Sequence, residues 1–298
     1  MKRICQFGLL ISAVVILNIT ALSGQAEADA KAGTPDGEFS RDELKEMIKT
    51  PEGTAAAQEA LAKAAQNPIA NMISLPLQNR TLFGIGPDDD TQNILNIQPV
   101  VPFGLNDNWN VITRTIAPLI WKPDVVGDGG TTFGLGDINA TMFFSPAKSS
   151  QFTWGVGPVF SFPTATDDVL GNDKWSAGLS GVALVMKGSW VVGGLISNLW
   201  SFAGNDDRAD VNQFLFQYFI NYNMADGWYL SSAPIITADW EADSGNQWTV
   251  PFGGGVGKIF KIGNQPMNAQ VQAFYNVEAP DNGPDWSLRL QLQFLFPK

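Results

Sequence analysis

The chain has 298 residues, and its 18 Lys and Arg against 29 Asp and Glu give a net charge of -11. This acidic balance argues against nucleic acid as the main partner, because proteins that bind phosphate backbones carry clustered Lys and Arg. Histidine is absent and Cys5 is the only cysteine, which disfavours His-activated nucleophiles, zinc and haem sites and disulfides. We therefore expect a protein that is not an enzyme and that carries no cofactor.

The N-terminus has the three parts of a secretory signal peptide. Met1-Lys2-Arg3 is positive, residues 4–19 are mostly apolar, and Ala26-Glu27-Ala28 fits the small-x-small cleavage rule. Residues 1–28 are thus predicted to be a cleaved signal peptide that removes Cys5. No later stretch approaches the ~18 consecutive apolar residues of a membrane helix. We expect the mature chain to be soluble beyond the inner membrane or a β-barrel in an outer membrane.

Residues 29–77 are predicted to be a polar helical N-terminal arm. Ser40-Arg41-Asp42-Glu43 is a capping-box pattern, and Thr50-Pro51 restarts a helix. The Ala-rich body of this second helix ends at Asn67-Pro68. The helices are too polar to form a core alone, so the arm either extends into the periplasm or plugs the lumen of a barrel. Its polarity favours the solvated extension.

The rest of the chain, residues 78–298, has a hydropathy period of two, which is typical of strands with differently solvated faces. The clearest run is C-terminal, where Leu288, Leu290, Leu292, Phe294 and Phe296 alternate with Ser287, Arg289, Gln291 and Gln293. Runs of this kind predict twelve strands, at 79–86, 92–103, 109–121, 134–145, 152–164, 176–187, 190–203, 211–224, 228–240, 248–261, 267–278 and 287–296. Their even number and length indicate an all-β fold, a transmembrane antiparallel up-and-down β-barrel.

The predicted connections alternate between short turns and long loops, as they do at the periplasmic and outer rims of outer-membrane barrels. The long loops hold most of the acidic residues, and we assign as acidic extracellular loop residues Asp88, Asp89, Asp90, Asp167, Asp168, Asp206, Asp207 and Asp210. Divalent cations could bridge such carboxylates to lipid phosphates, because Ca²⁺ and Mg²⁺ prefer oxygen ligands. No EF-hand spacing supports a defined metal site.

Tryptophan marks both ends of the predicted strands. Residues at the long-loop ends are Trp121, Trp200, Trp240 and Trp248, and those at the short-turn ends are Trp109, Trp190 and Trp228. This placement is typical of the two aromatic girdles of a membrane barrel, although tryptophan also occurs in the cores of soluble sandwiches. Apart from Glu278 at the edge of the last long loop, Asp137 and Asp239 are the only acidic residues of the predicted strands, which suits a wall in contact with hydrocarbon.

The polar faces of the predicted strands would line a lumen. By alternation they hold Arg114, Asp137, Asn139, Gln213, Gln217, Asn221, Gln270, Gln272, Arg289, Gln291 and Gln293. Eight-stranded barrels are filled by side chains and ~16 strands leave an open channel, so twelve strands predict a narrow pore lined by amides. Arg114, Arg289 and Asp137 would either form an internal ion-pair network or contact the solute.

Several segments resemble an outer-membrane family labelled as meta-pathway phenol-degradation proteins or transporters, members of which are sometimes mislabelled neuromedin U. The matching segments include 67–70, 84–87, 95–100, 109–115, 154–159, 163–167, 204–212, 247–251, 261–263 and 295–298. The resemblance covers about residues 67–298 and implies a barrel associated with transport. It does not assign a substrate.

Together these features predict an outer-membrane channel through which small solutes, with organic compounds as candidates, pass without energy input. An acidic mouth would disfavour anions and enrich cations at low salt. The alternative is a non-conducting structural or adhesive barrel whose acidic loops bind a partner. A soluble periplasmic binding protein is a third reading. The expected partners are outer-membrane lipid and a small-molecule solute, not nucleic acid.

Overall fold

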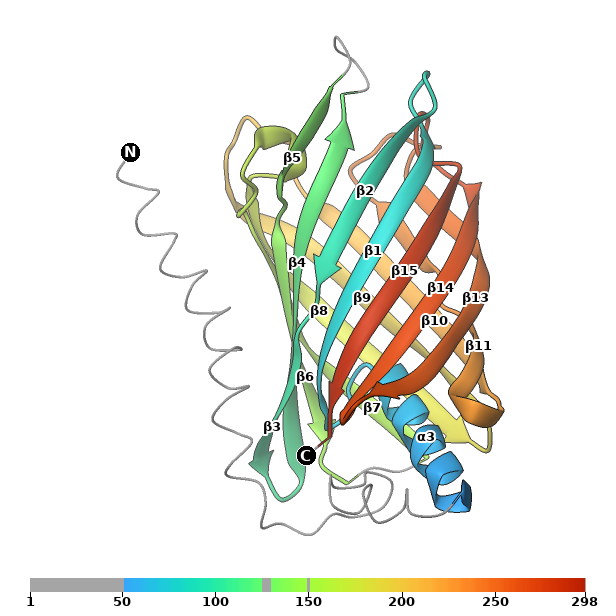
Figure 1. Ribbon diagram of the computed structural model, residues 1–298. Helices are drawn as coiled ribbons and strands as arrows, with labels where there is room; N and C mark the ends of the chain where they lie inside the picture. The colour runs from blue at the N-terminus through green and yellow to red at the C-terminus, as the bar shows by residue number, and fades with distance from the viewer. Residues whose placement is uncertain (1–50, 125–129, 149–150, 298) are drawn as a thin grey trace.

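The computed structural model describes residues 51–124, 130–148 and 151–297 (Figure 1). The predicted signal peptide and the predicted capping box at Ser40 lie outside these residues. The elements are α3 (Pro51–Gln66), β1 (Ile73–Ile85), β2 (Asp90–Ile97), β3 (Val100–Asn106), β4 (Trp109–Pro123), β5 (Thr131–Leu135), β6 (Ile138–Pro146), β7 (Phe152–Phe162), η1 (Asp168–Leu170), β8 (Lys174–Lys187), β9 (Trp190–Gly204), β10 (Asn212–Asn223), η2 (Ala225–Gly227), β11 (Trp228–Ser232), β12 (Ile235–Asp239), β13 (Trp248–Ile262), β14 (Gln265–Glu278) and β15 (Trp286–Phe296).

These segments form a closed antiparallel barrel of 12 strands, as predicted. Three of the strands are each interrupted once, between β2 and β3, between β5 and β6, and between β11 and β12. Pro99 and Pro234 stand at two of these breaks, because proline has no N–H to donate to the ladder. The barrel closes where β1 pairs with β15, from Ile73 opposite Phe296 to Phe83 opposite Trp286.

The predicted strand positions agree with the structure except at the start of the barrel. β1 begins at Ile73, whereas the first strand was expected at residue 79. The alternation already starts here, since Ser74, Pro76 and Gln78 line an interior cavity. Pro76 masked this signal, because proline is rare inside strands.

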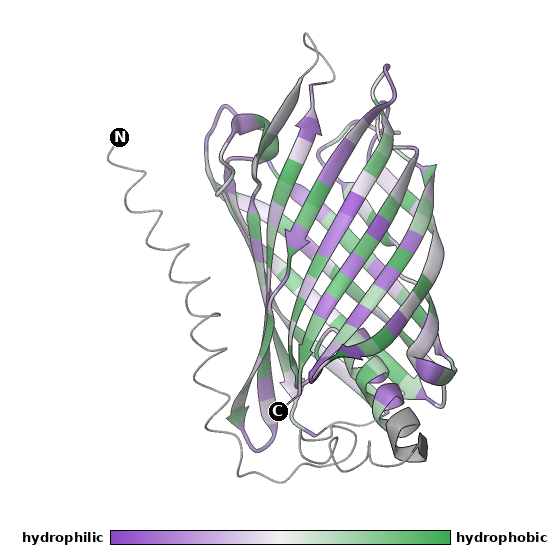
Figure 2. Ribbon diagram, in the orientation of Figure 1, coloured by the Kyte–Doolittle hydropathy of each residue, from purple (hydrophilic) through white to green (hydrophobic). Residues whose placement is uncertain are grey.

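The two faces of the barrel wall differ in polarity. Figure 2 shows hydrophilic and hydrophobic residues that alternate along the strands. Large apolar side chains that are exposed on the outer face include Phe152, Leu179, Ile196, Ile220, Leu230, Phe252, Val271, Tyr275 and Leu290. A soluble protein rarely exposes so large a continuous apolar surface. Hydrocarbon is therefore the solvent that this outer face fits.

Aromatic side chains gather at both ends of the outer face. At the long-loop end Trp240 packs against Trp248 with ring centroids 5.3 Å apart, and both are exposed. At the short-turn end Trp190 packs against Tyr222 at 4.8 Å, and Lys258 lies 4.6 Å from the ring of Trp228. These positions match the predicted girdles, because amphipathic rings favour the membrane–water interface.

Two of the short turns contain positions with a positive φ angle, a conformation that favours glycine. Gly188 between β8 and β9 has φ 56°, and Gly263 between β13 and β14 has φ 59°. Tight hairpins need positive φ, which glycine adopts without steric cost. Both chain ends of the barrel lie at this rim, with α3 beside it (Figure 1). None of the helices among the described residues is long and apolar enough to cross a membrane.

A charge on the outer face should destabilise the barrel according to its depth in the bilayer. Leu290 lies at the middle of β15 and is exposed, so Leu290→Arg should lower the free energy of unfolding in liposomes by about 2–4 kcal/mol. Ile262 is exposed at the end of β13, and Ile262→Arg should cost at most about 1 kcal/mol near the interface. Urea titration followed by tryptophan fluorescence measures both values. Equal costs at the two positions would contradict a lipid-facing wall.

Candidate pore lining

The inner wall carries the polar side chains that alternation placed there. Six of the predicted lumen residues line one interior cavity, namely Arg114, Gln217, Asn221, Gln270, Gln291 and Gln293. Gln272 and Arg289 are buried on the same face of β14 and β15, where they pair across the strands. Asn139 pairs in register with Ile116 on β4, and Gln213 is exposed near the long-loop end of β10. Whether these residues contact a solute stays a prediction.

Asp137 does not take part in the ion-pair network that the sequence suggested. One carboxylate oxygen accepts hydrogen bonds from the N–H groups of Thr164 and Ala165, at 3.1 and 3.2 Å. The other oxygen accepts from the N–H of Asn172 at 2.7 Å. Asp137 lies at the break between β5 and β6, and its side chain reaches the loop between β7 and β8. It orders the β7–β8 loop, and the expected pairing with Arg114 and Arg289 is wrong.

Arg289 and Arg114 instead bond to uncharged groups of the wall. The Arg289 Nη1 donates to the carbonyl of Ala233 at 2.8 Å and to Gln272 Oε1 at 3.2 Å. Its guanidinium carbon lies 4.8 Å from the centre of the Phe274 ring. The Arg114 Nη2 donates to Gln98 Oε1 at 2.9 Å. Amide and carbonyl oxygens therefore hold both cations in place without neutralising them.

A chain of glutamine amides lies beside these arginines. Gln78 donates to Gln291 Oε1 at 2.9 Å, and Gln98 donates to Gln78 Oε1 at 3.5 Å. Further toward the short turns, the hydroxyl of Tyr229 donates to Asn268 Oδ1 at 2.7 Å. A Cβ at Gly257 would lie 2.1 Å from this tyrosine ring, so glycine leaves the space that the ring occupies. Between the arginines, the inner wall is thus a network of neutral donors and acceptors.

Sequence reasoning missed Arg80, Gln78 and Gln98 as lumen residues. Arg80 lies directly opposite Arg289 in the β1–β15 ladder, and the other two bond to the lining described above. Gln78 and Arg80 are two positions apart, as residues on one face of a strand are, but the residues between and after them, Asn79 and Thr81, are also polar. Asn79 faces outward, where it bonds to Asn93, so this stretch has no apolar face by which to recognise the strand.

The segment that precedes β1 packs against the inner wall. Ala57, Leu61 and Ala62 of α3 are buried in one cluster with the inward-facing Ile259 and Leu295. At the end of the helix, Gln66 Nε2 donates to Asn223 Oδ1 at 2.8 Å. Residues 57–72 therefore make the contacts expected of a plug, whereas residues 29–50 of the predicted arm lie outside the described residues, so the choice between an extension and a plug stays a prediction.

Ile69 carries this segment across the lumen to the opposite wall. It is 3% exposed and packs with Ile112, Phe143 and Leu184, which come from β4, β6 and β8. Its Cδ1 lies 3.3 Å from the position that a Cβ at Gly155 would occupy. A cavity of about 150 Å³ remains above the segment, bounded by Gln66, Asn67, Pro68 and the amides of the wall. The short-turn end of the lumen is therefore narrowed by apolar packing and not only by polar contacts.

The acidic residues of the long loops are mostly exposed to solvent. Those that are exposed are Asp88, Asp89, Asp167, Asp168, Asp206, Asp207 and Asp210, whereas Asp90 is half-buried at the start of β2. Among the described residues, no three acidic side chains come together in a way that could hold a metal ion. Arg208 donates to the carbonyls of Asp168 and Gly171, so a cation joins two neighbouring loops directly.

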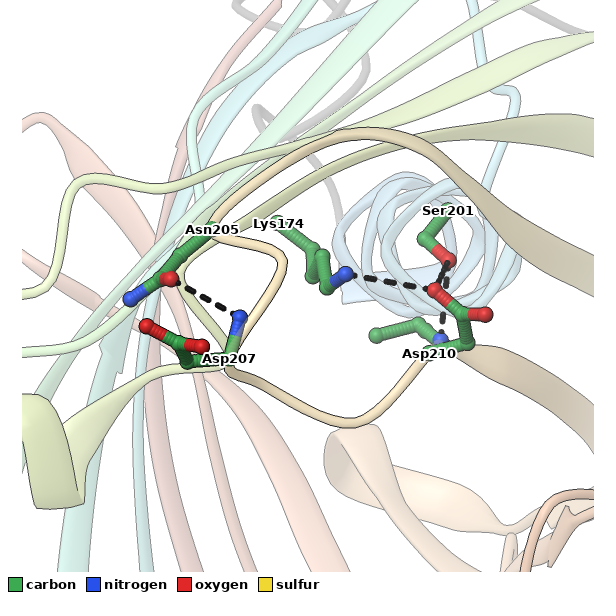
Figure 3. Close-up of polar contacts among 6 residues, drawn as sticks. Lys174, Ser201, Asn205, Asp207 and Asp210 are labelled. Atoms are coloured by element: carbon green, nitrogen blue, oxygen red, sulfur yellow. Dashed lines mark hydrogen bonds and ion pairs between the residues drawn. The ribbon is translucent and has the colours of Figure 1, made fainter.

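Asp210 forms the one ion pair that the long loops contribute among the described residues (Figure 3). Its carboxylate accepts from Lys174 Nζ and from Ser201 Oγ, both at 3.2 Å. The Lys174 side chain is 7% exposed and that of Asp210 is 73% exposed. The hydrogen bond from Lys174 and then that from Ser201, together with the Lys174 charge, lower the pKa of Asp210 below its ordinary value. The pair ties the β9–β10 loop to the start of β8.

A closed barrel with an apolar outside, aromatic girdles and a polar inside defines the class of transmembrane β-barrels. Among solved structures, the fold is similar to the COG4313 outer membrane channel from Pseudomonas putida F1, with 17% identity and a TM-score of 0.58 over 76% of this chain and 94% of that chain. A weaker likeness, at 9% identity and a TM-score of 0.46, joins 75% of this chain to 98% of the NanC porin. Outer membrane phospholipase A from Escherichia coli follows at 12% identity and a TM-score of 0.39, over 75% of this chain and 92% of that chain.

No family model and no curated protein matches the chain. At identities this low the likeness shows the fold, which is that of an outer-membrane barrel. The particular family suggested by the sequence segments is not confirmed. The fold alone does not decide between a channel and an enzyme, because one barrel architecture supports both.

The Lys174–Asp210 pair should make the loop contact sensitive to acid. A carboxyl whose folded pKa is lowered stabilises the fold above its unfolded pKa, and this contribution is lost as the pH falls through the lower folded value. Asp210→Asn should therefore lower the Tm in detergent at pH 7, and the difference from the wild-type chain should begin to shrink as the pH falls below about 4 and vanish below the lowered pKa of the folded state. Asp207→Asn is the control, because the backbone N–H of Asp207 and not its carboxylate bonds to Asn205. A difference between wild type and Asp210→Asn that persists at pH 2 would refute this role.

Proposed function

We propose that this protein lies in the outer membrane and lets small solutes, with organic compounds as candidates, diffuse through its lumen. The observation that carries the proposal is the reversal of polarity across one wall. Leu290 on the outside of β15 is exposed, while Arg289 and Gln291 beside it face a polar interior. The amides of this interior bound a cavity of about 150 Å³, which leaves space for a solute beside them.

The amide network supports passage of polar or amphipathic solutes. Gln217, Gln270 and Gln291 line the cavity and can exchange hydrogen bonds with a solute in place of water. Since amides both donate and accept, they accommodate different solutes without binding any one strongly. The absence of histidine from the chain supports a channel over a lipolytic barrel, because such enzymes mostly use a histidine base.

We further propose that residues 57–72 gate the lumen from the periplasmic side. Ile69 contacts the far wall through apolar side chains. The side-chain amides of Gln66 and Asn223 form hydrogen bonds with each other. Apolar burial stabilises the contact of one such side chain by only a few kcal/mol, so a change at Ile69 removes a substantial part of what holds this end of the segment to the far wall. The gate then sets how often the pore is open.

Replacing Ile69 with a charged residue should open the gate. Ile69→Asp places a carboxylate among Ile112, Phe143 and Leu184, where an unpaired charge is strongly disfavoured, so the segment should leave the lumen. We expect at least a tenfold higher open probability in planar bilayers than for the full mature wild-type chain, on the order of 1.4 kcal/mol in gating free energy.

The control for this experiment is Ile262→Asp, the same change at an exposed position of the same rim, which should leave the gating unchanged. Heat-modifiable gel mobility confirms that each variant is folded. If neither the wild-type chain nor Ile69→Asp conducts ions or passes sugars into liposomes, the structural or adhesive alternative is favoured.

A further inference from the structure

Three arginines of the lumen lie in one layer of the inner wall. Arg80 and Arg289 stand directly opposite each other on β1 and β15, and facing pairs of this kind have Cβ atoms about 5 Å apart. Arg114 on β4 reaches the same layer through Gln98 and Gln78, which bond to one another. Gln78 precedes Arg80 by two residues on the same face of the strand. The barrel therefore brings together residues that are more than 200 positions apart in the chain.

No acidic partner of these arginines lies in the part of the chain that the structure describes. Among the described residues, ion pairs join Lys63 to Glu59 and Lys174 to Asp210, and none involves the three lumen arginines. Two acidic residues that the sequence placed in the strands bond elsewhere, because Asp137 accepts from the β7–β8 loop and Asp239 accepts from the N–H of Glu241. The layer thus carries three positive charges, and Arg80 and Arg114 both repel Arg289.

The guanidinium groups also have more donors than the wall can satisfy. Each carries five N–H donors and no acceptor, yet the wall offers Arg289 two acceptors and Arg114 one. The Nε atoms of Arg80 and Arg289 are buried without a partner. Buried donors without partners are costly, so the layer is incomplete as it stands. An anion with two or more oxygens would satisfy these donors and offset the repulsion.

Apolar side chains of the same layer indicate that the anion it would bind also carries a hydrocarbon part. Leu82 follows Arg80 on the inner face of β1 and is 7% exposed. Ile94 lies opposite Arg80 on β2, and the ring of Phe274 lies under Arg289. A fully hydrated inorganic ion gains nothing from these groups, whereas a small hydrocarbon body is favoured beside them.

We propose that Arg80, Arg114 and Arg289 form a binding site for the carboxylate of a small organic acid on its way through the lumen. The planar guanidinium fork matches a carboxylate with two parallel hydrogen bonds. The inference deepens the proposed channel function and rests on it, since a solute can reach this layer only from the lumen. It also reverses, for the arginine layer, the preference for cations expected from the acidic loops.

Isothermal titration of the full mature chain in neutral detergent tests the site with benzoate as the probe. Sodium benzoate should bind saturably, while benzyl alcohol, which has the same ring without the charge, and sodium sulfate at equal ionic strength should not. Binding of benzyl alcohol as tight as that of benzoate would overturn the arginine site. Equal binding of sulfate would overturn the assignment to organic acids, and so would the absence of saturable benzoate binding.

Variants locate the site on the three arginines. Arg80→Gln, Arg114→Gln and Arg289→Gln should each weaken benzoate binding about tenfold or more, because each removes charge-assisted hydrogen bonds. Lys258→Gln removes a cation that lies over Trp228 on the outer face and should leave the affinity unchanged. Arg80→Gln is the decisive variant if Arg289→Gln fails to fold, since Arg289 also bonds to the wall. Unchanged affinity in Arg80→Gln and Arg114→Gln would refute the proposal.

The binding measurement is independent of conduction. A chain that passes sugars into liposomes after the Ile69→Asp change but binds no benzoate would retain the channel function and lose the anion site. A chain that binds benzoate but never conducts would lose the channel function instead.

Discussion

The backbone hydrogen-bond ladder between β1 and β15 is the constraint on which the rest of the structure depends. In hydrocarbon an unpaired N–H or C=O costs several kcal/mol, so a sheet can cross a bilayer only when it has no edge. Eleven consecutive pairs from Ile73 to Phe83 provide that closure. Once the ring is closed, strand alternation leaves each side chain only two environments, the lipid or the lumen.

The same constraint explains how much of the protein could be predicted from its sequence. Alternation in β10, where Phe214, Phe216 and Tyr218 face lipid, was enough to find the strand and its polar face, because hydrocarbon tolerates almost no polar group. β1 was placed too late, since Pro76 and the polar pair Asn79 and Thr81 weaken its alternation. The side of a strand that faces lipid must be apolar, so its residues alternate clearly in hydropathy. Where polar residues or proline interrupt this alternation, the strand is difficult to predict from the sequence.

The alternation of polar and apolar residues could not predict which distant residues contact each other. Period two identifies that Asp137 and Arg289 are both polar positions, yet it does not say at which height each lies in the barrel. Asp137 stands at a strand break near the outer rim and satisfies the N–H groups of a loop, whereas Arg289 lies within β15. Register across the ladder, which depends on turn lengths and strand shear, decides which residues meet. This is why Arg80 and Arg289 could not be paired from the sequence, although each stands in a strand that was predicted.

The direct connection between the lumenal segment and the first strand has a mechanical consequence. Only residues 67–72 separate the end of α3 from the start of β1, and six residues span at most about 20 Å when fully extended. The helix is therefore a tethered ligand of its own barrel. Its local concentration near the adjacent mouth of the lumen is in the millimolar range that short tethers give, whatever the number of copies in the membrane. For the proposed gate, reclosure would then be a first-order process whose rate depends on the length of the tether.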